Sequence, residues 1–454
     1  MTLLQNILFS LLLISCSAVL SRDPFHSRLA FSPTSQASSG LESSQAAAIS
    51  PIISLPITVD SNSLYVNISL GSSKSSFKLL IDTAYSWLTL IPQETGSDLF
   101  NCQLSQTCSP ILADLANIMF KSHDIGCYVV QDQATVKENT LTYEFLTTSK
   151  TNFTKIITNL PVSGLLGLRL IKPGTQDDEI ALRENGIETT SLNLVQTLKN
   201  KGIIEKAQFS IYLGPDNSTN NTLALGGYNP NSINGTATEI PVINENYWAL
   251  NVTGINVGKN KLPIKNTTAV ISTLARGLVF PQAAINSIYD YLMANSLCTG
   301  FTNSICYCGD SPCEYNPDAF PDLSLYFDGF QADIPGRAYL SNNNGTNELL
   351  IKKNEGGDHF ILLGHIFIQQ YVPLFNIESK TISLAKSINY IPPSGPNTNL
   401  PYYILVVTIL LAAVIGLGIF FINKNKEKHR IRSDSEALLI SSYSHKKSFD
   451  HIGL

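Results

Sequence analysis

The sequence predicts a mainly β protein of two related lobes, followed by one membrane-spanning helix. Residues 60–390 consist mostly of short segments in which apolar and polar residues alternate, the period of half-buried strands. Two similar strand-and-turn segments lie 190 residues apart, at residues 77–86 and 269–276, which indicates two lobes of one design. The run from Ile404 to Ile422 is almost wholly apolar and uncharged, long enough to cross a bilayer.

The length and charge of the chain narrow the class of protein. Its 454 residues are enough for two or three domains, and its net charge of −5 is mild. The central region shows no basic face, which argues against a nucleic-acid partner. We expect the lobes to occupy residues 59–238 and 239–392, with a linker at 393–402.

The N-terminal residues predict entry into the secretory pathway. An apolar run at residues 7–14 is followed by small residues, the pattern of a signal peptide over residues 1–21, although no Lys or Arg precedes it. The string Leu13-Ile14-Ser15-Cys16 resembles a bacterial lipobox, which is the alternative. Residues 22–58 are rich in Ser, Ala and Pro, so we expect a flexible leader or propeptide.

Strands are expected wherever alternation is clearest. Val66, Ile68 and Leu70 alternate with Tyr65, Asn67 and Ser69, so the first set should be buried and the second exposed. Further strands are expected at 208–213 and 222–226.

Three short helices are expected between the strands. The first follows Ser109-Pro110, a cap and a first-turn Pro, with Leu112, Leu115 and Met119 on one face. The other two are marked by apolar residues at helical spacing: Leu192, Val195 and Leu198 before Gly202, and Ile285, Ile288, Tyr289 and Leu292.

The C-terminal region predicts a single-pass type I membrane protein. The span should cover residues 403–422, and basic residues from Lys424 to Arg432 place the tail at 423–454 in the cytoplasm. Asp434, Leu438 and Leu439 resemble an acidic dileucine sorting signal that sorting adaptors would bind; the alternative is a solvated tail. Either the endolysosomal membrane or the cell surface would suit such a protein.

Glycosylation signals and cysteines agree with a secretory route. Eight Asn-x-Ser/Thr sequons precede the span, at Asn67, Asn152, Asn217, Asn220, Asn234, Asn251, Asn266 and Asn344. Cys102 and Cys108 are close enough in sequence to form a disulfide that closes a local loop. Two more disulfides are expected among Cys298, Cys306, Cys308 and Cys313, so Cys127 is the odd cysteine in this count. A metal site at the late cysteines is an alternative, although no His cluster accompanies them, and we expect no metal.

The paired turns differ at the residue that would carry chemistry. The first has Asp82-Thr83-Ala84 and the second Ser272-Thr273-Leu274. Two facing carboxyls share a proton, so that one activates water and the other donates to a scissile carbonyl. Asp82 can join such a pair, but the hydroxyl of Ser272 cannot share a proton as a second carboxyl would.

Residues 60–390 resemble the pepsin-like aspartic peptidases. Both turns resemble the two catalytic loops, and Cys102 and Cys108 resemble the first disulfide loop. The resemblance also rests on Gly164-Leu165-Leu166-Gly167-Leu168, on Tyr247-Trp248, and on residues 209–213, 225–227, 320–323 and 362–371. It implies a bilobal pepsin-like aspartic peptidase fold, an interlobe cleft for a peptide or protein ligand, catalytic positions at Asp82 and Ser272, and no cofactor.

Departures from the family pattern place activity in doubt. Ala84 and Leu274 replace glycines, and a Cβ there should crowd the carboxylates. The flap tyrosine position falls near Asp132; Ser163 and His365 stand where the pattern has aspartates. We therefore expect an inactive or impaired homologue that binds peptides or proteins. An active endopeptidase of an acidic compartment and a surface adhesion glycoprotein are the alternatives.

Overall fold

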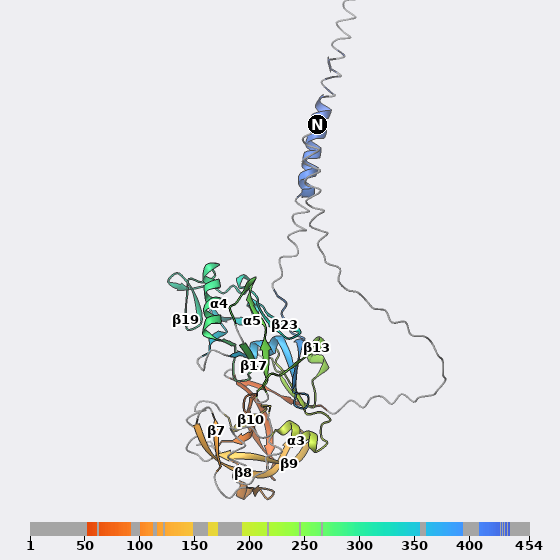
Figure 1. Ribbon diagram of the computed structural model, residues 1–454. Helices are drawn as coiled ribbons and strands as arrows, with labels where there is room; N and C mark the ends of the chain where they lie inside the picture. Colours follow the sequence, from red (N-terminus) through yellow and green to blue (C-terminus); the bar gives the residue numbers. More distant parts are fainter. Residues whose placement is uncertain are drawn as a thin grey trace, which may run out of the picture. The chain divides into compact units, whose positions relative to one another are not determined.

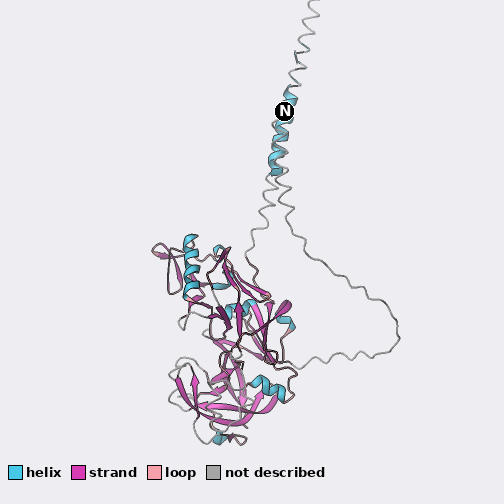
Figure 2. Ribbon diagram, viewed as in Figure 1, coloured by secondary structure: helices cyan, strands magenta, loops and turns pink. Residues whose placement is uncertain are grey.

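The computed structural model describes most of residues 52–426. The described ranges are 52–60, 63–91, 100–111, 116–120, 123–148, 162–170, 193–215, 218–244, 247–264, 267–354, 360–393 and 408–426, with Lys428, Arg430, Arg432, Ser433 and Ser435 beyond them. The predicted signal peptide and all but the end of the leader lie outside these residues. Strands predominate in both lobes, as Figure 2 shows.

The N-terminal lobe is built on a nine-stranded sheet, drawn in red to yellow in Figure 1. Its strands are β2 (Thr58–Asp60), β3 (Ser63–Leu70), β4 (Ser75–Asp82), β5 (Leu88–Leu90), β6 (Ser109–Pro110), β7 (Ala116–Phe120), β8 (His123–Val136), β9 (Asn139–Thr148) and β10 (Gly164–Gly167). The lobe also contains η1 (Cys102–Leu104) and α3 (Leu194–Asn200).

The C-terminal lobe contains three smaller sheets. The first has β14 (Ala249–Val252), β17 (Thr267–Ile271), β18 (Leu278–Phe280), β26 (Ile351–Lys353) and β27 (Phe360–Leu363). The second has β15 (Gly254–Val257), β16 (Asn260–Lys261), β22 (Leu323–Phe327) and β23 (Phe330–Ile334). The third has β19 (Gly300–Thr302), β20 (Ile305–Cys308), β21 (Ser311–Pro312), β24 (Leu340–Asn343) and β25 (Thr346–Leu349). The helical segments are α4 (Gln282–Ala294), η3 (Pro317–Ala319), α5 (Gly336–Tyr339) and α6 (His365–Gln370).

A six-stranded sheet joins the lobes. Its order is β1 (Ile53–Pro56), β12 (Thr222–Leu225), β11 (Gln208–Tyr212), β28 (Tyr371–Asn376), β29 (Thr381–Ser387) and β13 (Ile233–Pro241), with η2 (Pro230–Ser232) before β13. Phe209, Trp248 and Phe375 pack against one another with ring centroids 4.5–5.8 Å apart. The lobes therefore share a buried aromatic core as well as backbone pairing.

The two lobes repeat one three-strand arrangement. In the first, β4 pairs in parallel with β10, which pairs antiparallel with β5. In the second, β17 pairs in parallel with β27, which pairs antiparallel with β18. The two turns that follow β4 and β17 therefore occupy equivalent places.

A glycine at the end of the middle strand in each lobe lets the neighbouring turn approach closely. A Cβ on Gly167 would lie 2.4 Å from the Trp87 backbone nitrogen, and one on Gly364 would lie 2.2 Å from the Ala275 carbonyl oxygen. The obstructing atoms belong to the backbone, which cannot easily move, so only glycine fits at these two positions.

The close packing at Gly364 predicts a stability loss on substitution. Because the obstructing atoms are backbone oxygens, Gly364→Ala should lower the free energy of unfolding by about 1–3 kcal/mol. Thermal unfolding of the full-length protein measures this effect. Gly300→Ala is the matched control, since a Cβ there meets nothing within 4 Å. Equal unfolding temperatures for the two variants would contradict the prediction.

Several predicted elements appear where expected. The strands at 208–213 and 222–226 correspond to β11 and β12, and the second and third helices to α3 and α4. α3 begins at the Asn193 cap, whose side chain accepts from the Val195 N–H.

Two local predictions were wrong. Residues 116–120 form strand β7 rather than part of a helix, because they pair antiparallel with residues 123–127 of β8. Tyr65 is buried at 1% exposure, not exposed, and the Lys78 ammonium lies over its ring, 4.2 Å from the centroid. Tertiary contacts override local periodicity at both places.

One described helix, Thr408–Lys426, is long and apolar enough to cross a membrane. It begins after the predicted start of the span and extends four residues beyond its predicted end at 422. Residues 403–407 lie outside the described part of the chain.

Candidate functional site

The site lies where the two equivalent turns meet. Asp82 is the last residue of β4, and Ser272 directly follows β17. Thr83 and Thr273 come next and join the turns crosswise. The Thr83 hydroxyl donates to the Ile271 carbonyl at 2.8 Å, and the Thr273 hydroxyl donates to the Ile81 carbonyl at 2.7 Å.

Backbone groups complete this network. The Thr83 N–H donates to the Thr273 hydroxyl at 3.2 Å, and the Thr273 N–H donates to the Thr83 hydroxyl at 3.3 Å. Both threonines are almost fully buried. Four hydrogen bonds in a dry environment therefore fix the turns relative to each other.

Asp82 and Ser272 make the same local contact. An Asp82 carboxylate oxygen accepts from the Ala84 N–H at 2.8 Å, and the Ser272 hydroxyl accepts from the Leu274 N–H at 3.3 Å. Their exposures are 2% and 7%. The serine thus reproduces the structural bond of an aspartate at this point, but it brings no carboxyl.

The side chains that replace glycine are accommodated without backbone strain. Neither Ala84 nor Leu274 has a positive φ, and both backbone N–H groups still bond two residues back. Leu274 is 36% exposed, so its side chain points toward solvent rather than into the packed turn. The Leu274 side chain therefore does not crowd the turn, although the sequence had led us to expect this, because it extends away from it.

His365 stabilises the second turn through a hydrogen bond to its backbone. It is 6% exposed, and its Nε2–H donates to the Thr273 carbonyl at 2.7 Å. Burial lowers the pKa of His365, the hydrogen bond to Thr273 opposes that effect, and the Arg276 charge lowers the pKa further. A buried imidazole that donates to a backbone carbonyl has a structural role, and its Nε2 is already engaged at Thr273 rather than free to supply the acid that the second turn lacks.

His365 predicts an acid-dependent loss of stability. Its folded pKa lies below the ordinary 6.5, so near and below that pH the unfolded chain binds the proton more readily. Stability is therefore full above pH 6.5 and falls as the pH drops toward the folded pKa. His365→Gln, which keeps an N–H donor for Thr273, should flatten the pH dependence of the unfolding temperature. Parallel curves for the two proteins from pH 4 to 7 would contradict this.

Asp132 belongs to a different cluster. It is 1% exposed in β8, where one carboxylate oxygen accepts from the Thr107 hydroxyl at 2.5 Å and the Gln133 N–H at 2.7 Å. The Cys102–Cys108 disulfide closes the loop that contains Thr107. The residue at the expected flap position thus anchors the disulfide loop.

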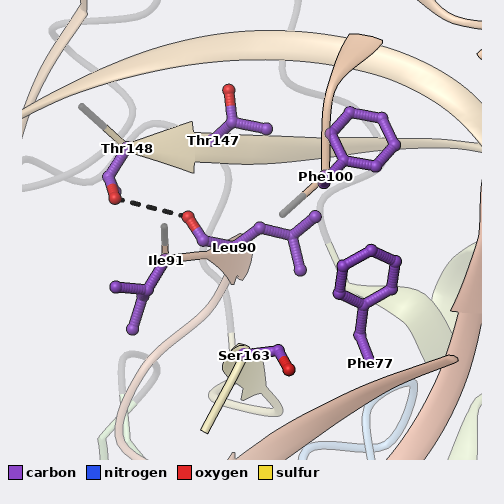
Figure 3. Close-up of a pocket in the computed structure, with 7 residues that line it drawn as sticks. All are labelled: Phe77, Leu90, Ile91, Phe100, Thr147, Thr148 and Ser163. Carbon is purple, nitrogen blue, oxygen red and sulfur yellow. Dashed lines mark hydrogen bonds between the residues drawn. The ribbon is translucent and has the colours of Figure 1, made fainter. Parts of the chain in front are cut away.

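A small cavity in the N-terminal lobe is distinct from the site (Figure 3). It measures about 40 Å³ and is lined by Phe77, Leu90, Ile91, Phe100, Thr147, Thr148 and Ser163. That volume holds about one water molecule, whose share of the liquid is ~30 Å³. Ser163, one of the two departures from the family's aspartates, therefore lines this small cavity.

The remaining predicted site residues lie elsewhere. The structure forms the disulfides Cys102–Cys108, Cys298–Cys306 and Cys308–Cys313, and Cys127 is buried without a disulfide. Within the described residues, no cluster of three or more metal-ligating side chains occurs. Asn67, Asn220, Asn234 and Asn344 are exposed and Asn251 is half-buried. Asn152, Asn217, Asn266, Asp434, Leu438 and Leu439 lie outside the described residues.

One pair of side chains beside the site, Arg169 and Tyr247, could not be predicted from the sequence. The Arg169 guanidinium lies 5.5 Å from the ring centroid of Tyr247, and the backbone N–H of Arg169 donates to the Tyr85 carbonyl in the first turn. The neighbouring Leu168 carbonyl accepts from the Trp248 indole across the lobes at 2.8 Å. No pattern in the sequence indicated that residues 169 and 247 meet.

Comparison with known proteins agrees with this architecture. The sequence model of the family described as eukaryotic aspartyl protease matches residues 63–387. Embryonic pepsinogen of Gallus gallus is 25% identical over 71% of this chain and 80% of its own length. Pepsin A of Bos taurus is 23% identical over 70% of this chain and 82% of its own length. A probable vacuolar protease A of Arthroderma benhamiae is 22% identical over 71% of this chain and 78% of its own length. The chain belongs to the eukaryotic aspartyl protease family.

Proposed function

We propose that this protein is a catalytically impaired pepsin-like homologue that binds peptides or proteins at the junction of its lobes. The observation that carries the proposal is the pair of equivalent contacts at Asp82 and Ser272. The second turn keeps the form of a catalytic loop but presents a hydroxyl in place of a carboxyl.

The chemistry of amide hydrolysis explains the impairment. One carboxylate must take a proton from water while its partner donates a proton to the carbonyl, and a shared proton sets both roles. A serine hydroxyl has no accessible ionisation near neutral or acidic pH and cannot alternate between these states. The loss of one acid–base partner costs about 10²–10⁴ in rate.

Binding does not require the second carboxyl. Affinity for a peptide depends on the shape and hydrogen bonding of the scaffold, whereas rate depends on contacts made in the transition state. The crosswise threonine bonds and the Trp248–Leu168 contact support an intact scaffold. Leu274 adds an exposed apolar side chain beside the junction, suited to contact an apolar ligand residue.

We extend the proposal to a membrane-anchored protein of the secretory pathway. The helix Thr408–Lys426 and the basic residues that follow support one span with a cytoplasmic tail. The sequons and disulfides suit a lumenal ectodomain. On this proposal, adaptors would bind the tail through Asp434, Leu438 and Leu439, and the membrane would be endolysosomal or the cell surface.

An active endopeptidase of an acidic compartment is the second candidate. The observation that favours it is Asp82 itself, which is buried and oriented by the Ala84 N–H.

One assay separates the two candidates. The full-length protein in detergent is incubated with a mixed peptide library from pH 3 to 7, and both retained and cleaved peptides are identified. If the protein is an impaired homologue, we expect it to retain peptides intact. Background cleavage should then be the same for the wild-type protein and for Asp82→Asn. Cleavage that disappears in Asp82→Asn supports the active peptidase, while a library neither retained nor cleaved contradicts both.

A further inference from the structure

A polar groove lies on the six-stranded sheet, at the end formed by β1, β12 and β11. It measures about 510 Å³, within the ~300–1,000 Å³ typical of small-molecule sites. Its lining residues are Ser54, Pro56, Tyr212, Thr219, Asn220, Asn221, Thr222, Asn229, Asn231 and Ser232.

The chemistry of the groove selects its occupant. None of these described lining residues carries a charge, so the groove offers little to an ion or a phosphate. Asparagine amides supply both donors and acceptors, and hydroxyls supply either. The aromatic ring of Tyr212, which also lines the groove, adds an apolar group. Such a combination fits a neutral molecule with many hydroxyl and amide groups, as a sugar has.

The groove is organised before any ligand arrives. The register of β1, β12 and β11 places Pro56, Thr222 and Tyr212 side by side. The Tyr212 hydroxyl accepts from the Asn389 side chain at 2.6 Å, which fixes the ring. A preorganised site loses less entropy when it binds.

The acceptor of a glycosylation sequon stands at the edge of this groove. Asn220-Asn221-Thr222 satisfies the Asn-x-Thr pattern; the Asn220 side chain is exposed and also lines the groove. Asn221 is 4% exposed and holds the loop, because its side chain accepts from the Gly214 N–H and donates to the Ser218 carbonyl. A sugar on Asn220 would therefore start at the edge of the groove, on a loop that the Asn221 side chain holds in place.

We propose that the glycan attached to Asn220 packs its first sugars into this groove. In the attachment step, Nδ2 of Asn220 loses a proton and bonds to C1 of a lipid-linked oligosaccharide, and the lipid pyrophosphate leaves. The Asn231 side chain, which makes no hydrogen bond among the described residues, then contacts the sugars. The glycan becomes part of the sheet surface at the lobe junction.

Site-resolved deglycosylation tests the proposal. The full-length protein is made in eukaryotic cells with mannose trimming blocked, and release by an endoglycosidase is followed by peptide mass spectrometry. Each native rate is divided by the rate at the same site in the denatured chain. We expect release at Asn220 to be about tenfold slower than at the exposed Asn67 and Asn344, equivalent to about 1.4 kcal/mol or one to two hydrogen bonds.

A groove variant supplies the matched comparison. Asn231→Ala removes only an exposed side chain and should speed release at Asn220 several-fold without changing other sites. Asn286→Ala, an exposed position of α4, should change nothing. An unmodified Asn220, native release as fast as at exposed sites, or a rate at Asn220 unaffected by Asn231→Ala would overturn the proposal.

Discussion

Ser272→Asp combined with Leu274→Gly should raise the rate of peptide cleavage by about 10²–10⁴-fold. The new carboxylate would accept from the N–H of residue 274, as Asp82 accepts from the Ala84 N–H. Leu274→Gly removes the apolar side chain beside it. The two acids would then share a proton, so activity should be highest at acidic pH. The measurement is the initial cleavage rate of the mixed peptide library between pH 3 and 7.

The control for this gain is Asp82→Asn in the same double variant. It should return cleavage to the background level, since one carboxyl is again missing. Cleavage by Leu274→Gly alone should stay at the background level. This variant distinguishes the effect of the new carboxyl from the effect of removing the leucine side chain. A double variant that binds peptides but cleaves no faster than wild type would show that the rest of the site has also diverged.

Thr273→Val should destabilise the protein by about 2–4 kcal/mol. Valine is similar in shape but removes the donor to the Ile81 carbonyl and the acceptor for the Thr83 N–H. Each partner then loses this bond in a buried environment, at about 1–2 kcal/mol for each. The apparent unfolding temperature of the full-length protein should fall by roughly 5–10 °C.

Thr273→Ser is the matched control because it keeps the hydroxyl. It should lose much less stability than Thr273→Val, and the combination Thr83→Val/Thr273→Val should fall short of the sum of the singles. Equal unfolding temperatures for the serine and valine variants would mean that the crosswise bonds contribute little.

The candidate site was largely predictable because the sequence segment that forms it occurs twice in the chain. The segments ending in Asp82 and Ser272 share an apolar strand, a Thr and a turn, and such a repeat implies equivalent places in equivalent lobes. The strands β11 and β12 and the helices α3 and α4 followed from period and caps. Local patterns suffice where the local and tertiary preferences agree.

Other features depend on contacts that no local pattern encodes. Residues 116–120 have helical spacing with their neighbours, yet strand pairing with β8 decides their conformation. The hydrogen bond from His365 to Thr273 spans 92 residues. The groove around Asn220 draws on β1, β11, β12 and η2, which meet only in the folded sheet.

A single comparison tests the central claim most directly. The peptide cleaved fastest by Ser272→Asp/Leu274→Gly is incubated with wild type and with Asp82→Asn, at equal high concentration and across pH 3–7. If a hydroxyl opposite one carboxylate cannot support amide hydrolysis, product should form at the same background rate in both samples. Product from wild type that vanishes with Asp82→Asn would contradict the account.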